Sequence, residues 1–332
     1  MSKRLEYISW IQFIGVLCVI FGHSMNDIAV PDMLKSIKMW IYIFHMPLFF
    51  LVSGYLFSYN GGFEHKGGVW GTLKGKFLRL MVPYVIWNVL FIAPKVMMAD
   101  YTNDQVELTP EYFGMMMIYP RNNVLGHTWF LFALFEMFII AILFEKLREK
   151  KQLWLPVFLI LAVINCFGVQ ERFLAIGDLM KNGVFFWSGL ILGSVNYDAI
   201  KDWGSNKALL YTLLFIIVGG TVIWCLRRDM LINMLVVGLA VLVFLAMIQI
   251  MTGIKGNFIE FVSRNSFAIY IMHWPILMVI RLIVYQKLHW APIPTMIIMF
   301  VGGLAIASGI AWIFRQFKSP FMKGFNKLVL GM

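Results

Sequence analysis

The chain has 332 residues, of which 61% are hydrophobic and 14% are charged, and its formal net charge is +11. Soluble globular domains average roughly 45–50% apolar and about 25% charged residues, so this composition excludes a water-soluble globular protein and favours a chain embedded in a lipid bilayer. The positive charge is explained by membrane topology and by contact with anionic membrane lipids. No nucleic-acid-binding motif accompanies it, and we expect no nucleic-acid partner.

Apolar runs of about 18–22 residues without alternation follow one another along the chain and predict membrane-spanning helices rather than barrel strands. Helices also satisfy their own backbone polar groups, as hydrocarbon requires. We therefore predict an all-α, polytopic transmembrane helix bundle that forms a single domain over residues 1–332. The expected spans, about ten in number, cover residues 5–24, 39–58, 79–98, 127–145, 153–169, 176–196, 208–226, 231–252, 265–285 and 294–315.

Lysine and arginine gather in the loops on the side of the membrane that both termini would share, whereas acidic residues such as Asp27 and Glu107 fall on the other side. Cytoplasmic loops carry the excess of such cations, so we expect both termini in the cytoplasm and a multi-pass protein of the inner (plasma) membrane. The pair Arg227–Arg228 on an outer loop is the main exception. The segment 97–126 is expected to form a short cap on the outer side.

Three cysteines fall within apolar runs, and no pair has the spacing of a metal site. Cysteines in such positions usually act as small apolar packing residues, so we expect neither a disulfide framework nor a bound metal. They are Cys18, Cys166 and Cys225.

The first span carries a histidine near its outer end, His23, eleven residues after Gln12. At about 100° per residue, eleven steps return to nearly the same helix face, about 16 Å further along. This face carries the polar atoms of an otherwise apolar helix and should point into the bundle. Ionisable groups inside a membrane are functional candidates, so we predict that His23 is catalytic and that Gln12 lies at the donor site. The alternative is that His23 is a packing residue.

The second span contains FHMPLFFLVSGYLF, residues 44–57, in which Pro47 should bend the helix. Ser53 and Gly54 are small, which allows a ligand or another backbone to approach closely. We count both as candidate donor-binding residues, with ordinary helix packing as the alternative. His45 could carry protons or form a plain interhelical hydrogen bond.

The start of the third span is basic, and its Lys76 and Arg79 are three residues apart on one helix face. Two cations placed in this way suit a multiply charged anion such as the phosphates of a nucleotide. We therefore predict that both bind the donor. The alternative is that they only anchor the helix at the cytoplasmic side.

Two later spans carry further ionisable groups. His127 stands at the outer edge of the fourth span, and Glu136 lies in its middle, where an ionised carboxylate is expensive. We expect both to be catalytic, with Glu136 protonated, paired or orienting a histidine. His273 lies in the ninth span just ahead of Pro275, and taken alone it is a structural residue.

These segments, in this order, resemble the acyltransferase-3 family of integral membrane acyltransferases. That family shows a first-span histidine, a run F-x-x-P-L-F-F-x-x-S-G-Y/F, a basic segment before Pro-Tyr, then H-x-W-F-L and a late N-S-x-x-I-Y-x-x-H-x-P. The matching positions here are His23, Phe44–Tyr55, Lys76 and Arg79 before Pro83–Tyr84, His127–Leu131 and Asn265–Pro275. The resemblance covers nearly the whole chain.

The resemblance implies that the chain moves an acyl group, usually acetyl from acetyl-CoA, onto a hydroxyl of a cell-envelope carbohydrate. It assigns the essential histidine to His23 and a basic pair to Lys76 and Arg79. Two positions depart from the family pattern: Gln12 replaces a cation, and Ser9 replaces an aspartate. The departure removes a charge that could bind phosphate or orient the histidine.

The expected mechanism is a relay across the membrane. Lys76 and Arg79 hold the phosphates of cytosolic acetyl-CoA, the pantetheine arm carries the thioester into the bundle, and His23 acts as general base on the acceptor hydroxyl. The rival interpretation is a transporter, flippase or export accessory protein for lipid-linked sugars, and a third is a scaffold for polysaccharide assembly. A homodimer is compatible with such a bundle.

Overall fold

The computed structural model describes residues 6–64, 67–99, 106, 109–166, 171–195 and 256–331. All regular structure in these ranges is helical, as predicted, and they contain no strand. Five helical stretches within them are long and apolar enough to cross a membrane. These are α1 (Glu6–His23), α2 (Asp32–Tyr59), Gly68–Met97, Ser266–Lys287 and α14 (Pro292–Gln316).

The described residues contain the following individual helices and turns besides α1, α2 and α14. The stretch Gly68–Met97 divides into α3 (Gly68–Leu90) and α4 (Ile92–Met97), and Ser266–Lys287 divides into α13 (Ser266–Ile280) and the π-helical turn η6 (Arg281–Lys287). The other helices are α5 (Pro110–Ile118), α6 (Trp129–Leu147), α7 (Trp154–Cys166), α8 (Ile176–Ser194), α12 (Asn257–Arg264) and α15 (Pro320–Val329). Four short 3₁₀ turns are η2 (Pro120–Asn122), η3 (Gly126–Thr128), η4 (Lys151–Leu153) and η5 (Phe173–Ala175).

The chain is therefore a helical membrane protein. The spans expected at 208–226 and 231–252 lie outside the described residues, so the count of about ten stays a prediction, as does the cytoplasmic placement of the termini. Two boundaries differ from the predicted ones. The second span begins at Asp32 and the third at Gly68, because both helices continue through polar residues that a hydropathy pattern excludes. Lys76 and Arg79 consequently lie inside α3 rather than at its first turn.

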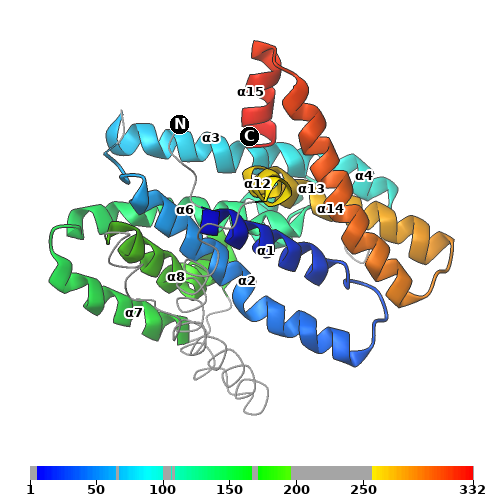
Figure 1. Ribbon diagram of the computed structural model, residues 1–332, viewed down its shortest axis with the longest axis horizontal. Helices are drawn as coiled ribbons and strands as arrows, with labels where there is room; N and C mark the ends of the chain where they lie inside the picture. Colours follow the sequence, from blue (N-terminus) through cyan, green and yellow to red (C-terminus); the bar gives the residue numbers. More distant parts are fainter. Residues whose placement is uncertain are drawn as a thin grey trace.

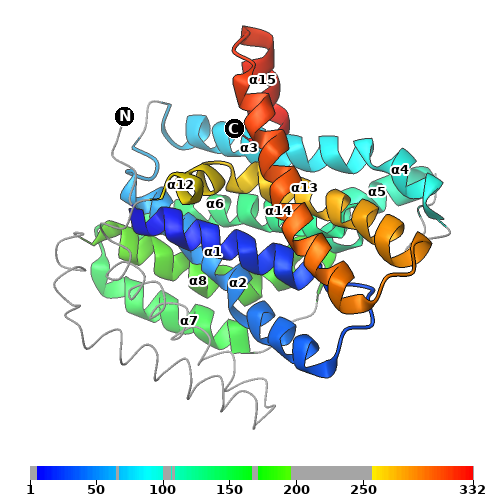
Figure 2. The same cartoon turned by 45° about the vertical axis from the view of Figure 1, so that its right-hand side comes forward.

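The helices pack as a bundle in which α3 and α7 lie on opposite sides, with α1, α6 and α8 between them (Figure 1, Figure 2). Contacts between neighbours follow this order, since α3 packs on α6, α6 on α8 and α8 on α7. On another side, α14 crosses α13 and also contacts α1.

The most extensive helix contact joins α2 to α8, and glycines make it close. A Cβ at Gly54 would overlap the carbonyl oxygen of Phe186, and one at Gly189 or Gly193 would overlap a carbonyl oxygen of α2. Gly189 and Gly193 are four residues apart on one face, the small-residue spacing that lets helices approach closely in membranes. This contact fixes α2 and α8, which both contribute to the site described below.

Two clusters of buried apolar side chains fill the bundle. One is rich in aromatic residues from α2, α6 and α8, and the other joins α1, α13 and α14. Phe49 and Trp87 pack against both clusters.

The turn after α1 is tied to the end of α13. Arg281 of η6, largely buried, forms an ion pair with Asp27. Asp27 has φ 55°, a left-handed conformation that is uncommon outside glycine. The ion pair holds the chain immediately after His23 against the helix that carries His273.

Candidate active site

Two cavities lie inside the bundle, and they take residues from opposite ends of α1 and α2. The larger, which we call the histidine cavity, has a volume of about 720 Å³ and is lined by His23 at the end of α1 and by the earlier part of α2 up to Pro47. The smaller, the Lys76–Arg79 cavity, has about 400 Å³ and is lined by Gln12 of α1 and by the later part of α2.

In the histidine cavity, His23 contacts a second histidine. Its Nδ1 lies 3.3 Å from Nε2 of His273 on α13, and its ring meets the Trp274 ring edge-on with centroids 4.8 Å apart. His273 is completely buried, so its ring is fixed by the surrounding helices. The pair brings together the first and ninth predicted spans.

The hydrogen-bond partners assign the protons of this pair. Nδ1 of His273 lies 2.5 Å from the carbonyl oxygen of Tyr270, and because a carbonyl can only accept, this nitrogen must be the donor. In a neutral ring the other nitrogen, Nε2, then only accepts, so Nδ1 of His23 must donate to it. Nε2 of His23 is left with its lone pair, which is what a general base needs.

His127 is placed by a proline on the facing helix. Pro275 has no N–H, so the carbonyl of Ile271, four residues earlier, has no partner within α13. Nε2 of His127 lies 3.3 Å from that carbonyl oxygen and donates to it. Nδ1 of His127 is then an acceptor, and it is buried without a partner in the part of the chain that the structure describes. It can receive a hydrogen bond from a hydroxyl in the cavity.

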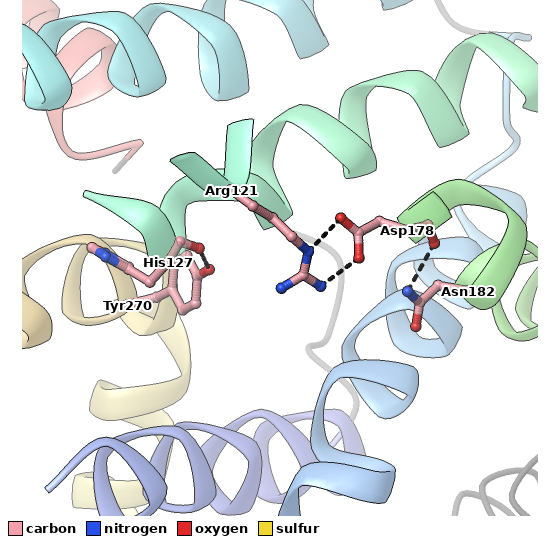
Figure 3. A network of polar contacts seen from close by, with 5 residues as sticks. All are labelled: Arg121, His127, Asp178, Asn182 and Tyr270. Atoms are coloured by element: carbon pink, nitrogen blue, oxygen red, sulfur yellow. Dashed lines mark hydrogen bonds and ion pairs between the residues drawn. The ribbon is translucent and has the colours of Figure 1, made fainter. Parts of the chain in front are cut away.

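Figure 3 shows the bonds that hold this wall of the cavity. The Tyr270 hydroxyl donates to the carbonyl oxygen of His127, which fixes η3 against α13. Arg121 of η2 forms a two-point ion pair with Asp178 of α8, with Nε 2.8 Å from Oδ2, and the backbone carbonyl of Asp178 accepts from Asn182 at 2.8 Å. The Arg121 guanidinium also lies 4.0 Å from the Trp129 ring.

The Lys76–Arg79 cavity is built differently. Nζ of Lys76 lies 3.9 Å from the centre of the Phe138 ring, and the Arg79 guanidinium lies 5.9 Å from that of Phe267. Ser53 and Thr72 add hydroxyl groups, and Oγ1 of Thr72 is buried without a partner among the described residues. No carboxylate is among the described residues that line the cavity, so its two cations suit an anionic ligand.

Most of the predicted site residues divide between the two cavities. His23 and His127 line the histidine cavity, whereas Lys76, Arg79 and Ser53 line the other. Gln12 also lines the second cavity, and its Oε1 accepts a hydrogen bond from the Ser263 hydroxyl at 2.7 Å. The face shared by Gln12 and His23 thus does point into the bundle.

Two predicted residues, Gly54 and Glu136, line neither of these two cavities. Gly54 faces the backbone of α8, so its small size serves helix packing rather than donor binding. Glu136 lies in the middle of α6 with one carboxylate oxygen buried and unpartnered among the described residues, and it forms no bond to a histidine there. The residue bonded to His23 is His273, which the sequence taken alone indicates to be structural; its spacing from Pro275 is the available signal.

Tyr270 lines both cavities and so forms their common wall. Its ring meets Phe130 at a centroid distance of 5.5 Å, and Phe130 meets Phe49 at 6.0 Å. The continuous path expected from Lys76 to His23 is therefore interrupted by aromatic side chains. A ligand that reaches from one cavity into the other requires Tyr270 or its neighbours to move.

The fold and the two cavities define a membrane-embedded protein with a pair of histidines at one cavity and a pair of cations in the other. The sequence profile of the acyltransferase-3 family, described as an acyltransferase domain, matches residues 5–312, and the chain belongs to this family. This confirms the resemblance seen in the sequence and supports acyl transfer as the general reaction. No curated protein and no solved structure matches the chain.

Proposed function

We propose that the protein transfers an acyl group, acetyl in the simplest case, from acyl-CoA to a hydroxyl of a cell-envelope carbohydrate. In this proposal the protein lies in the inner membrane with both termini in the cytoplasm. The Lys76–Arg79 cavity then opens toward the cytoplasm, where acetyl-CoA is made, and the histidine cavity faces outward. Family membership and the location of His23 in a cavity support the proposal.

The donor binds through its phosphates. Lys76 and Arg79 neutralise their charge, and the hydroxyl groups of Ser53 and Thr72 offer hydrogen bonds to the pantetheine arm. Gln12 stands where other family members carry a cation, so this chain relies on the α3 pair for charge. The arm runs along the cavity toward Tyr270, beyond which lies His23.

The acceptor binds in the histidine cavity. Nε2 of His23 takes the proton of the acceptor hydroxyl while the hydroxyl oxygen attacks the thioester carbonyl. The C–S bond then breaks, and the departing thiolate takes the proton from His23. Nε2 of His273 accepts the Nδ1–H bond of His23 throughout and so stabilises the imidazolium that forms between the two steps. A general base of this kind contributes about 10²–10⁴ in rate.

Nδ1 of His127 has a separate role. As an unpartnered acceptor on the same cavity wall, it receives a hydrogen bond from a second hydroxyl of the acceptor and orients the sugar. Correct orientation is itself a large contribution to rate, because it removes the entropy of aligning two reactants.

The observation that carries this proposal is the bonding of His23 to His273 within a large cavity. The test is mass spectrometry of envelope glycans from cells with and without the gene. We expect an acetyl group to disappear on deletion and to return with the wild-type gene but not with His23→Gln. Identical glycans in all strains would contradict the proposal.

The second candidate is a transporter or flippase for lipid-linked sugars. Two cavities at opposite ends of the same helices, separated by a wall, would also suit alternating access. Movement of a lipid-linked sugar across sealed vesicles without acetyl-CoA would favour this function. A homodimer stays a prediction in either case.

A further inference from the structure

We propose that the acceptor carries an anionic group, a carboxylate or a phosphate, which the rim of the histidine cavity binds. This inference rests on the proposed function and narrows its substrate class. Four cationic side chains line the cavity, and no aspartate or glutamate does so among the described residues. They are Lys95, Arg121, Arg172 and Lys181.

The four cations come from separate parts of the chain. Lys95 belongs to α4, Arg121 to η2 and Lys181 to α8, while Arg172 precedes η5. Cations that merely keep one helix face solvated would lie on one element. All four line a single cavity, which indicates that they serve a ligand bound there.

Their positive charge is only partly neutralised by the protein. Arg121 is paired with Asp178, so Arg121 adds hydrogen-bond donors to the cavity wall but little net charge. Arg172 donates at 3.2 Å to the side-chain oxygen of Asn122, which is neutral. In the part of the chain that the structure describes, neither Arg172 nor Lys181 forms an ion pair with a carboxylate. The cavity rim therefore keeps a positive field.

Membrane topology strengthens the argument that these four cations bind a ligand. Lysine and arginine are depleted from outer loops because they disfavour translocation. In the proposed orientation the histidine cavity opens outward, so topology argues against four cations there. The same argument cannot be made for Lys76 and Arg79, because topology alone already favours cations on the cytoplasmic side.

The deeper part of the cavity supplies groups for the neutral part of a sugar. Besides Nδ1 of His127, the side-chain amide of Asn123 lies on its wall. One is an acceptor and the other a donor, a combination that suits sugar hydroxyls. A volume of about 720 Å³ also lies within the usual range for small-ligand sites. With its anionic group bound at the rim, the acceptor can place a hydroxyl of the same molecule at His23.

Binding of matched ligands to the purified full-length protein in a neutral detergent tests this inference. We would use two acid–neutral pairs, tetragalacturonate with its carboxyl-reduced form and glucose 6-phosphate with glucose. Dissociation constants are measured by calorimetry in the His23→Gln variant, so that binding is separated from catalysis. A failure of acyl transfer would then leave this result intact.

We expect at least one acid to bind about tenfold or more tightly than its neutral partner, which corresponds to about 1.4 kcal/mol. The preferred pair tells whether carboxylate or phosphate is recognised. The double variant Arg172→Gln/Lys181→Gln should abolish the preference, and added salt should weaken it. Lys287→Gln removes an exposed cation from the end of η6 and should change nothing. Equal binding within both pairs, or a preference that survives the double variant, would overturn the inference.

Discussion

Both cavities are lined by cationic and aromatic side chains, but they hold their polar groups in different ways. At the histidine cavity two rings are fixed by bonds to backbone, His273 by the carbonyl of Tyr270 and His127 by that of Ile271, and His23 is in turn bonded to His273. In the Lys76–Arg79 cavity the cations lie against aromatic rings, and no hydrogen bond of theirs to another described residue is seen. Under the proposed function, the difference suits oriented proton transfer at His23 and the binding of donor phosphates at Lys76 and Arg79.

Proline explains part of this difference. Pro275 removes a backbone donor from α13, and the carbonyl that it releases orients His127. The cost of an unpaired backbone group in a membrane is thereby met by a side chain of the site. The comparison can be tested by removing one feature of each cavity at a time.

The largest effect is expected from His23→Gln. Glutamine keeps a polar side chain but cannot act as a base at neutral pH, so kcat for acetyl transfer should fall by about 10²–10⁴. Transfer is measured with labelled acetyl-CoA and purified protein in lipid vesicles. His289→Gln is the matched control, since His289 is exposed and lines neither cavity. Equal activity of the two variants would remove His23 from the mechanism.

The double variant Lys76→Gln/Arg79→Gln should come next. Each cation loses a charge-assisted bond to phosphate, worth about 1.5–3 kcal/mol, so KM for acetyl-CoA should rise by about 10² or more while kcat changes little. Lys74→Gln is the control, because Lys74 is exposed on the same helix and outside the cavity. If the double variant resembles the control, the α3 cations are topological anchors.

A smaller effect, about tenfold on kcat, is expected for His273→Leu, since the imidazolium of His23 loses a hydrogen bond worth about 1–1.5 kcal/mol. His273→Gln supplies an amide oxygen near the position of Nε2 and should restore part of the rate. KM for acetyl-CoA should be unchanged in both. A purely structural role for His273 would give equal loss in both variants, together with a lower yield of folded protein.

The smallest effect concerns the wall between the cavities. Tyr270→Ala should connect them and let water from the histidine cavity reach the thioester, so hydrolysis of acetyl-CoA without acceptor should rise a few-fold. Tyr270→Phe keeps the ring and should show no such rise. Release of free CoA is the measurement. Unchanged hydrolysis in Tyr270→Ala would mean that another residue closes the path.

Much of this arrangement was predictable from single helices. The helical periodicity placed Gln12 and His23 on one face, and the apolar runs gave the membrane helices. Lys76 and Arg79 were recognisable from their spacing within a basic segment. Each of these inferences needs only the geometry of one helix and the preference of charges for water or phosphate.

The remainder depends on contacts between distant segments. His273 and Tyr270 acquire their roles only because α13 lies beside α1 and η3, which no local pattern specifies. Gly54 was assigned to ligand binding because small residues serve both ligands and helix packing, and only the position of α8 decides between them. The pairing of Arg121 with Asp178 likewise spans more than fifty residues of sequence.

The most direct test of the account uses sealed vesicles that expose the cytoplasmic side and enclose an acceptor glycan. Labelled acetyl-CoA is added outside, and the enclosed glycan is recovered and analysed. With the wild-type protein we predict acetyl label on a hydroxyl of the enclosed glycan, and with His23→Gln none above background. Label that enters equally with both proteins, or glycan that crosses the membrane without acetyl-CoA and stays unlabelled, would contradict acyl transfer at His23.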